Sequence, residues 1–259
     1  MRVISPPKTY PPVGHCIYCN STEESLSDEH IIPYGLGGNL VLPRASCKKC
    51  ARQTGRVEQV CLRQMLRPFR LKHGIPDKPR HKKEQPKELP LEMSVIGKPA
   101  ETHMVSITEY PEALVLPQYP ASSVFTKMPV DSNITLMAQV LFNDSVLRDL
   151  YEKHGATIFK IGNLNFAVFA QMLAKIAHAY VAANETRPYR ALLYDTIIHG
   201  KTPMFFVGSE EGIPPVTNPE SLHQIEHEDR MANDGRRYVG ASIRLFSGLA
   251  TPRYIIPVG

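Results

Sequence analysis

The sequence contains no tryptophan, few cysteines and no long uninterrupted run of apolar residues. Its best apolar stretch, residues 166–183, is interrupted by Gln171, Lys175 and His178, whereas a bilayer span needs about 20 apolar residues in succession. The first 15 residues are rich in proline and lack the apolar segment of a secretory signal. These absences argue against a membrane or secreted protein, and we expect a soluble, cytoplasmic chain with no membrane partner.

Acidic residues are scarce between Arg44 and Lys87. This segment holds fourteen Lys or Arg against three acidic residues, a net charge of +11, while the whole chain carries only +5. The remainder of the chain therefore sums to −6. A basic block of this kind favours a polyanionic partner such as nucleic acid, although a solvated, flexible linker would have the same composition.

Only five cysteines are present, but four of them form two Cys-x-x-Cys pairs. Cys16 and Cys19 make one pair, Cys47 and Cys50 make the other, and Cys61 stands alone. Each pair supplies two thiolates from one tight turn, and four thiolates close a tetrahedral zinc site that is structural rather than catalytic. The spacing predicts a structural Zn²⁺ held by these four residues, and we expect Cys61 to be a small core residue.

The residues between the two cysteine pairs are expected to fold as strand, turn, strand and helix. The segment Asp28-Glu29-His30-Ile-Ile-Pro33 is typical of a short strand stopped by proline. Gly37-Gly38 predicts a tight turn, residues 39–43 predict a return strand, and Cys47 opens a helix. Zinc would then pin the two ends of this module together.

The apolar pattern divides the chain into three segments and indicates an α+β fold. After Cys50, apolar residues recur at steps of three and four up to Gly74, as in a helix. Residues 1–73 therefore make the cysteine module. Residues 74–90 are rich in proline and lysine and make a basic linker, and residues 91–259 make a mixed α+β domain.

The second domain is expected to contain two helices and several short strands. The apolar stripe of residues 165–184 predicts the strongest helix, and residues 187–199 predict another that ends at Gly200. Strands are expected at 93–96, 103–108, 113–116, 132–138, 157–161, 204–207, 238–246 and 254–258, the last two as a hairpin.

The cysteine module resembles the HNH endonuclease family, the ββα-metal nucleases, over about residues 13–60. The shared markers are an acidic residue and a histidine at the end of the first strand, a Gly-Gly turn, and a Cys-x-x-Cys pair before the helix. In this sequence they are the two cysteine pairs, Glu29-His30 with Pro33, Gly37-Gly38, Gly55 and Glu58. The resemblance implies a metal-dependent endonuclease that hydrolyses phosphodiester bonds, preferably in double-stranded DNA. The resemblance does not cover the second domain, which could recognise the target, bind a protein or ligand, or form a homodimer.

The resemblance also implies roles for individual residues. His30 is the general base that takes a proton from water. Glu29 is the first ligand of a catalytic Mg²⁺ or Mn²⁺, with Asp28 as its substitute. The family usually carries an asparagine in the second strand that braces the loop. In this chain the nearest equivalent is Asn39, directly after Gly38.

The second ligand of that catalytic cation is where this chain departs from the family. Many members carry Asn or His one or two positions after the last cysteine, where this chain has Ala51 and Arg52. Glu58 on the same helix is the best replacement, and Thr54 shares its face. Gln53 is a further option.

Basic residues around the second cysteine pair are expected to bind backbone phosphates. These are Lys48, Lys49, Arg52, Arg56 and Arg63.

Three other readings remain open at this stage. The chain could be a catalytically degenerate zinc-knuckle module that binds nucleic acid, or a zinc-folded protein-interaction module. The latter would have no salt-dependent affinity for DNA. In addition, His223-Gln-Ile-Glu226-His227 matches a zinc-peptidase pattern, but it lies in a polar stretch without a strong helix, and we expect a chance match.

Overall fold

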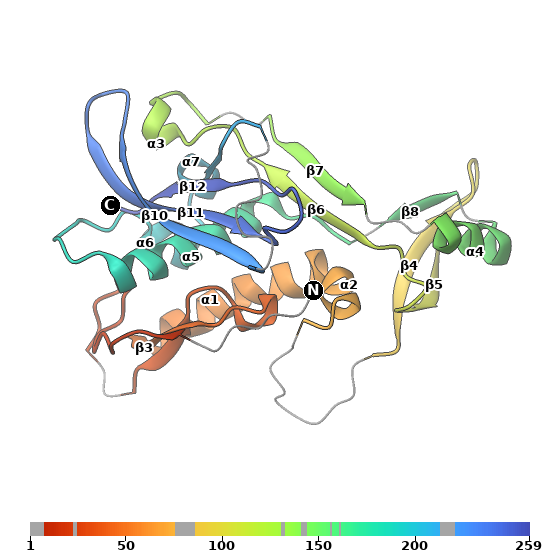
Figure 1. The fold of residues 1–259 in the computed structure, drawn as a ribbon, viewed down its shortest axis with the longest axis horizontal. Coiled ribbons are helices and arrows are strands. Elements are labelled where there is room, and N and C mark those ends of the chain that lie inside the picture. The colour runs from red at the N-terminus through yellow and green to blue at the C-terminus, as the bar shows by residue number, and fades with distance from the viewer. Residues whose placement is uncertain are drawn as a thin grey trace.

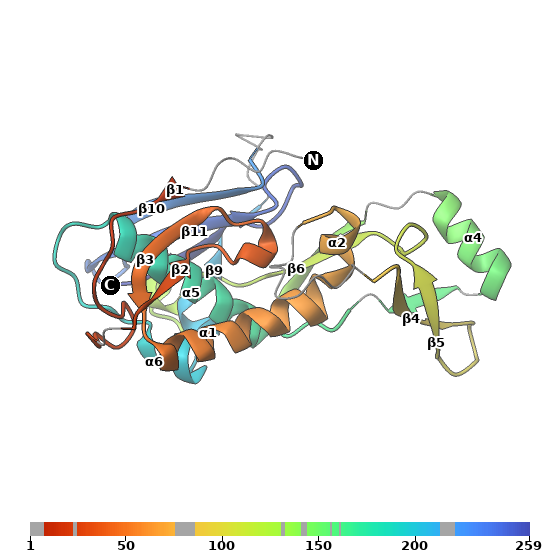
Figure 2. The same cartoon turned by 90° about the horizontal axis from the view of Figure 1, so that it is seen from below.

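The N-terminal module is built on a small sheet and one long helix. In this computed structural model, strands β2 (Ser27–His30) and β3 (Leu40–Ser46) pair antiparallel, and β1 (Lys8–Thr9) adds to β3 in parallel. Helix α1 (Lys48–Val60) follows β3 directly and lies alongside the two longer strands (Figure 2). The expected strand–turn–strand–helix order is therefore present, with a return strand that runs three residues further than predicted. The structure describes residues 8–22, 25–75, 86–130, 133–140, 144–155, 157–160, 162–212 and 221–259.

The helix after Cys50 is one continuous run with a change of pitch. Helix α1 passes into a π-helical turn, η2 (Cys61–Met65), and then into α2 (Arg67–Lys72). The predicted apolar positions face the core, and the run ends before Gly74 as expected.

A buried helix forms the centre of the molecule. Helix α5 (Phe166–Asn184) lies between α1 and a four-stranded sheet (Figure 1). That sheet has the order β10-β11-β12-β9, all antiparallel. Its strands are β9 (Gly208–Ser209), β10 (His223–Met231), β11 (Arg237–Leu245) and β12 (Tyr254–Pro257). By length and composition α5 could cross a membrane, but 67% of its apolar window is buried inside the protein, as in a core helix.

A second lobe extends from one end of this body. It has a three-stranded sheet, a covering helix and its own small core around Leu91 and Leu150 (Figure 1). A two-stranded ribbon connects it to the body. The lobe consists of β4 (Glu88–Ser94), β5 (Glu101–Ser106), β8 (Ile158–Lys160) and α4 (Asp144–His154), and the ribbon of β6 (Ala113–Gln118) and β7 (Thr135–Val140).

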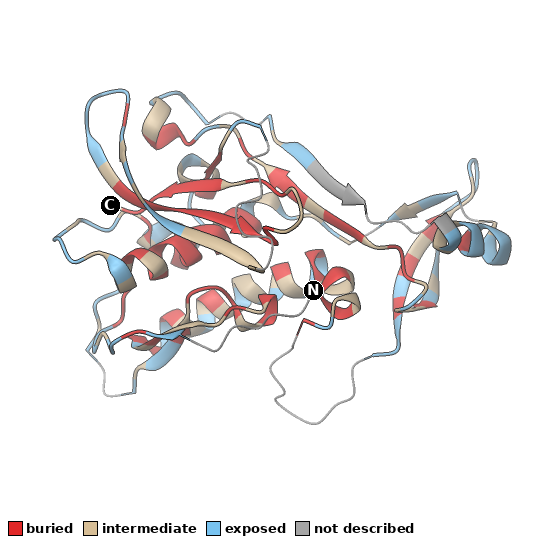
Figure 3. Ribbon diagram, viewed as in Figure 1, coloured by how far each residue is buried: buried red, intermediate tan, exposed pale blue. Residues whose placement is uncertain are grey.

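The main core joins the N-terminal module to the C-terminal half of the chain. One cluster of buried apolar side chains runs from Tyr10 to Val258 and includes the cysteine knuckles, α5 and β11. Helix α5 is buried along most of its length, whereas α4 is largely exposed (Figure 3). Residues of the C-terminal half therefore pack directly against the cysteine module.

Two predicted elements of the C-terminal half were wrong. The helix expected at 187–199 is only α6 (Tyr194–His199), because Pro188 follows the end of α5 and the chain runs irregularly until Leu193. The strand expected at 204–207 is a single helical turn, α7 (Pro203–Phe206), with proline at its first position. Helix α3 (Ser123–Thr126) was not predicted.

Candidate functional site

The four cysteines of the two Cys-x-x-Cys pairs come together. All four sulfur atoms lie within 4.8 Å of one another, and Cys19 Sγ is 3.7 Å from Cys47 Sγ. Four sulfurs at a zinc–sulfur distance of about 2.3 Å would stand about 3.8 Å apart in a regular tetrahedron. Within the described part of the chain no other group of three or more metal-ligating side chains gathers in this way. The donor set fits a structural zinc ion.

The local backbone explains how the knuckles form. Asn20, with φ of 59°, turns the chain after the first pair, and its amide donates to the carbonyl of Cys16 at 2.8 Å. Cys47 is the N-cap of α1, so the second pair lies on the first helical turn. Cys61 is buried away from the cluster, with its sulfur 3.7 Å from the Val168 carbonyl, as expected for a core residue.

The loop between β2 and β3 is held by two side chains from elsewhere in the chain, Arg70 on α2 and His223 on β10. Its short 3₁₀ turn, η1 (Tyr34–Leu36), receives Arg70 Nε on the carbonyl of Gly35 and His223 Nε2 on the carbonyl of Leu36, the latter at 2.7 Å. The Gly-Gly turn is required sterically, because Gly37 has φ of 82° and a Cβ on Gly38 would lie 2.1 Å from the Ile32 carbonyl oxygen. The loop is thus fixed relative to β2.

His30 ends β2 beside this loop. Its side chain is half-buried, and its Nδ1 atom faces the interior. The ring packs edge-on against Tyr34, with 5.8 Å between centroids. Its backbone carbonyl accepts a hydrogen bond from the ammonium group of Lys175 on α5.

Lys175 also pairs with both carboxylates that the sequence offered as ligands of a catalytic cation. Its Nζ lies 2.6 Å from Glu29 Oε1 and 2.9 Å from Glu58 Oε1. The side chains of Lys175 and Glu29 are 1% and 6% exposed, and that of Glu58 is 23% exposed. Buried Glu29 and Lys175 and the partly exposed Glu58 thus form one group, which we call the carboxylate–lysine cluster.

The electrostatics of this cluster follow from its burial. Burial raises the pKa of Glu29 above its usual range, while Lys175 opposes the rise. Burial alone would lower the pKa of Lys175, but attraction to Glu29 and Glu58 outweighs it and raises that pKa to about 12. Lys175 therefore carries its positive charge at neutral pH.

The residues expected at a catalytic Mg²⁺ or Mn²⁺ do not, as they stand, form a site for such an ion. A hard divalent cation needs several free oxygen ligands, and an ammonium group already lies between Glu29 and Glu58. The exposed Asp28 instead accepts from the backbone amide of Arg44 at 3.2 Å.

The other residues expected to bind the cation or to brace the loop make separate contacts. Thr54 is buried and donates within α1 to the carbonyls of Cys50 and Ala51. Gln53 reaches the Ile198 carbonyl at 3.3 Å. Asn39 is half-buried at the start of β3, where its backbone carbonyl accepts from the amide of Lys8.

The basic residues of α1 form an exposed face of the N-terminal module. Three of them line an open hollow of about 780 Å³ with Ser25 and Ser27, at the start of β2. Arg63 on η2 is also exposed, but it lines a different hollow, together with Arg67 and Lys160. The exposed cations of α1 are Lys48, Lys49, Arg52 and Arg56.

His178 is a packing residue on the buried face of α5. Its Nε2 donates to the carbonyl of Ile17 at 2.7 Å, and its ring stacks on Tyr18 at 5.4 Å. Burial lowers the pKa of His178, so the ring is neutral at neutral pH. Helix α5 therefore contacts the first knuckle as well as β2.

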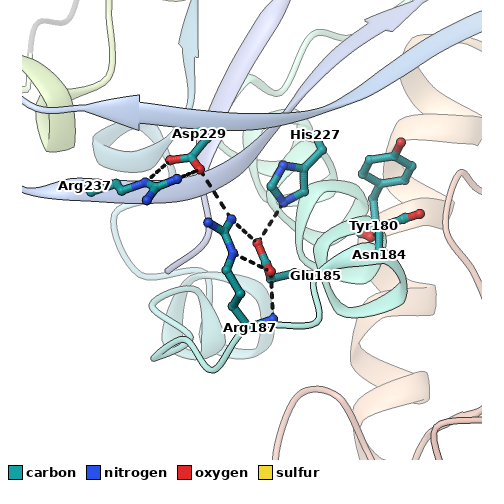
Figure 4. Close-up of polar contacts among 7 residues, drawn as sticks. All are labelled: Tyr180, Asn184, Glu185, Arg187, His227, Asp229 and Arg237. Atoms are coloured by element: carbon teal, nitrogen blue, oxygen red, sulfur yellow. Dashed lines mark hydrogen bonds and ion pairs between the residues drawn. The ribbon is translucent and has the colours of Figure 1, made fainter.

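The peptidase-like pattern at residues 223–227 lies on strand β10, not on a helix. His223 holds the loop at Leu36, whereas His227 lies 3.1 Å from Glu185 at the end of α5. Glu185 and the neighbouring Asp229 are both bridged by Arg187, and Arg237 adds to Asp229 (Figure 4). The two histidines serve separate contacts, which supports a chance match.

Lys175 is the site residue that sequence reasoning missed. The available signal was a lysine in the middle of an apolar helical stripe, a position where charge needs a buried partner. Its partners lie more than a hundred residues earlier in the chain, so local pattern could not identify them.

Comparison with known proteins bears on the N-terminal module alone. Residues 16–66 match the family model described as HNH endonuclease. No curated protein and no solved structure matches the chain. The match spans both cysteine pairs, His30 and the basic helix, so the N-terminal part of this chain carries an HNH endonuclease domain with a four-cysteine cluster that suits zinc.

Proposed function

We propose that the chain hydrolyses phosphodiester bonds in nucleic acid, with His30 as the general base. The observation that carries this proposal is the position of His30 in the HNH domain. It ends β2, is half-buried, and lies beside the loop that Arg70 and His223 hold in place. A fixed, partly accessible imidazole suits proton transfer near pH 7.

The reaction assigned to His30 is attack of water on phosphorus. The imidazole takes a proton as the water oxygen forms its bond to phosphorus, and the bond to the leaving oxygen breaks. The leaving oxygen takes its proton from solvent water, and the lysines and arginines of α1 balance the charge on the phosphate oxygens. The four cysteines hold the structural zinc that supports the module, because a closed thiolate tetrahedron has no open position for substrate.

The exposed basic face of α1 is proposed to bind the substrate. Lys48, Arg52 and Arg56 line the hollow at the start of β2 and can each pair with a backbone phosphate. Contacts to phosphates do not read the base sequence, so they suit double-stranded DNA but do not select a target sequence. We assign target choice, or dimerisation, to the remainder of the chain.

A second candidate function is binding of nucleic acid without cleavage. The observation in its favour is that Lys175 already holds the two carboxylates expected to bind a catalytic cation, and that Ala51 follows the last cysteine. Under this alternative, His30 could be replaced without loss of affinity.

Cleavage of supercoiled plasmid by zinc-loaded protein tests the proposal. Wild type, His30→Ala and the control His103→Ala, from the distant strand β5, would be assayed with Mg²⁺, with Mn²⁺ and without added cation. Nicked or linear product from wild type and the control, but not from His30→Ala, supports the nuclease. Binding of plasmid without cleavage by any of the three would favour the second candidate.

A further inference from the structure

We infer that the ammonium group of Lys175 is the resident cation of this HNH domain. It fills the position between Glu29 and Glu58, so the domain acts on nucleic acid without a divalent ion at those carboxylates. Action on nucleic acid rests on the proposed function, whereas the occupancy of the two carboxylates can be measured without any substrate.

The coordination of the Lys175 ammonium group is complete. An ammonium group has three N–H donors and no acceptor. Here its oxygen neighbours are one carboxylate oxygen of Glu29, one of Glu58 and the backbone carbonyl of His30, with the Ile31 carbonyl further away at 3.4 Å. The carboxylates face the ammonium group from two elements, β2 and α1, while the lysine comes from a third.

These oxygens are of the kind that a hard cation prefers, but charge and space exclude a second cation. Mg²⁺ requires six ligands at about 2.0–2.1 Å, and a cation bound to both carboxylates would lie close to the ammonium group. Two like charges at such a distance repel strongly in a buried site. One ammonium group against two carboxylates already leaves the cluster with at most a single net negative charge.

Lys175 cannot readily move aside to admit a metal ion. Its side chain is 1% exposed and comes from the middle of α5, which is packed between α1 and the C-terminal sheet. Withdrawal of the ammonium group would leave Glu29 buried without its cation. The lysine is therefore a built-in part of the site.

The same ammonium group positions His30. It donates to the backbone carbonyl of His30, so the end of β2 is fixed from α5. Lys175 is thus a positioning residue for the proposed base, in addition to balancing the carboxylates.

Binding of Mn²⁺ to the zinc-loaded protein, measured by electron paramagnetic resonance without nucleic acid, tests the inference. We expect no Mn²⁺ site in wild type that depends on Glu58, and one new site in Lys175→Met, where the two carboxylates are released. The double variant Lys175→Met/Glu29→Gln should lose that new site, which separates it from adventitious binding at the surface.

Either of two results would overturn the inference. One is a Mn²⁺ site in wild type that disappears in Glu58→Gln. The other is a folded, zinc-loaded Lys175→Met that gains no site. If Lys175→Met does not fold, wild type and Glu58→Gln are compared alone. Equal Mn²⁺ binding by these two proteins supports the inference, because no Mn²⁺ site then depends on Glu58. Failure of plasmid cleavage would count against the proposed function and would leave the Mn²⁺ result unchanged.

Discussion

The Lys175 ammonium group on α5 lies 2.6 Å from the Glu29 carboxylate on β2. This ion pair connects the C-terminal half of the chain to the strand that ends in His30. It is reinforced by His178, which reaches the first cysteine knuckle from the same helix, and by His223, which holds the loop from β10. The HNH domain is therefore braced from three positions outside residues 16–66.

Replacing Lys175 should destabilise the protein strongly. Lys175→Met leaves Glu29 buried without its cation, and loss of one partner of a buried pair costs about 3–5 kcal/mol in unfolding free energy. The matched control is Lys160→Met, which breaks an exposed pair with Glu92 and should change stability by less than about 1 kcal/mol. Urea unfolding of the zinc-loaded proteins measures both. Equal effects of the two substitutions would mean that the buried pair contributes no more than a surface one.

Zinc content should depend on the paired cysteines and not on Cys61. Cys47→Ala removes one thiolate from the cluster, so the purified protein should lose its zinc, whereas Cys61→Ala should retain one zinc per chain. Elemental analysis gives the zinc content, and circular dichroism before and after chelation reports the folding that depends on it. Zinc retained at full occupancy in Cys47→Ala would show that the four sulfurs do not act as one site.

Sequence pattern was most informative where the structure depends on local spacing. The two cysteine pairs, the Gly-Gly turn and the long apolar helix each follow from residues that are close in sequence, and the structure has all three. The antiparallel pairing of β11 with β12 was also predicted, because a short connection with Gly248 and Pro252 separates two apolar runs.

The contents of the site were harder to predict because they depend on distant parts of the chain. Glu29 and Glu58 were identified as carboxylates that face one site, but their partner is Lys175 on a helix packed by tertiary contacts. The same holds for His223, whose role at Leu36 depends on how β10 lies against the module. A charged or polar residue in an apolar pattern indicates that a partner exists, but not which one.

Stability should fall as pH decreases, partly through His223. Its Nε2 donates to the Leu36 carbonyl and its Nδ1 accepts from the amide of Phe246, so the ring is held neutral. Burial lowers the pKa of His223 to about 4, from 6.5 in its ordinary state. The unfolded chain therefore binds more protons between these values, and the stability due to neutral His223 is lost progressively as pH falls from 6.5 towards 4.

The size of this pH effect can be measured with His223→Gln. Between about pH 7 and pH 5, wild type should lose about 2 kcal/mol of unfolding free energy more than His223→Gln does. Some pH dependence should remain in the variant, because burial also lowers the pKa of His178. The control His154→Gln, at an exposed position at the end of α4, should follow wild type. Parallel curves for wild type and His223→Gln would contradict the assignment.

Affinity for nucleic acid should depend on salt through the basic face of α1. Arg52 and Arg56 are exposed one turn apart and line the hollow at the start of β2. Each phosphate contact contributes about one unit to the slope of log affinity against log salt, so Arg52→Ala/Arg56→Ala should reduce that slope by about 2. The control Lys98→Ala/Lys153→Ala makes the same charge change on the second lobe and should leave the slope near that of wild type. Fluorescence anisotropy with a short DNA duplex at several salt concentrations gives these slopes, and an equal reduction in both double variants would mean that net charge, not this face, binds the nucleic acid.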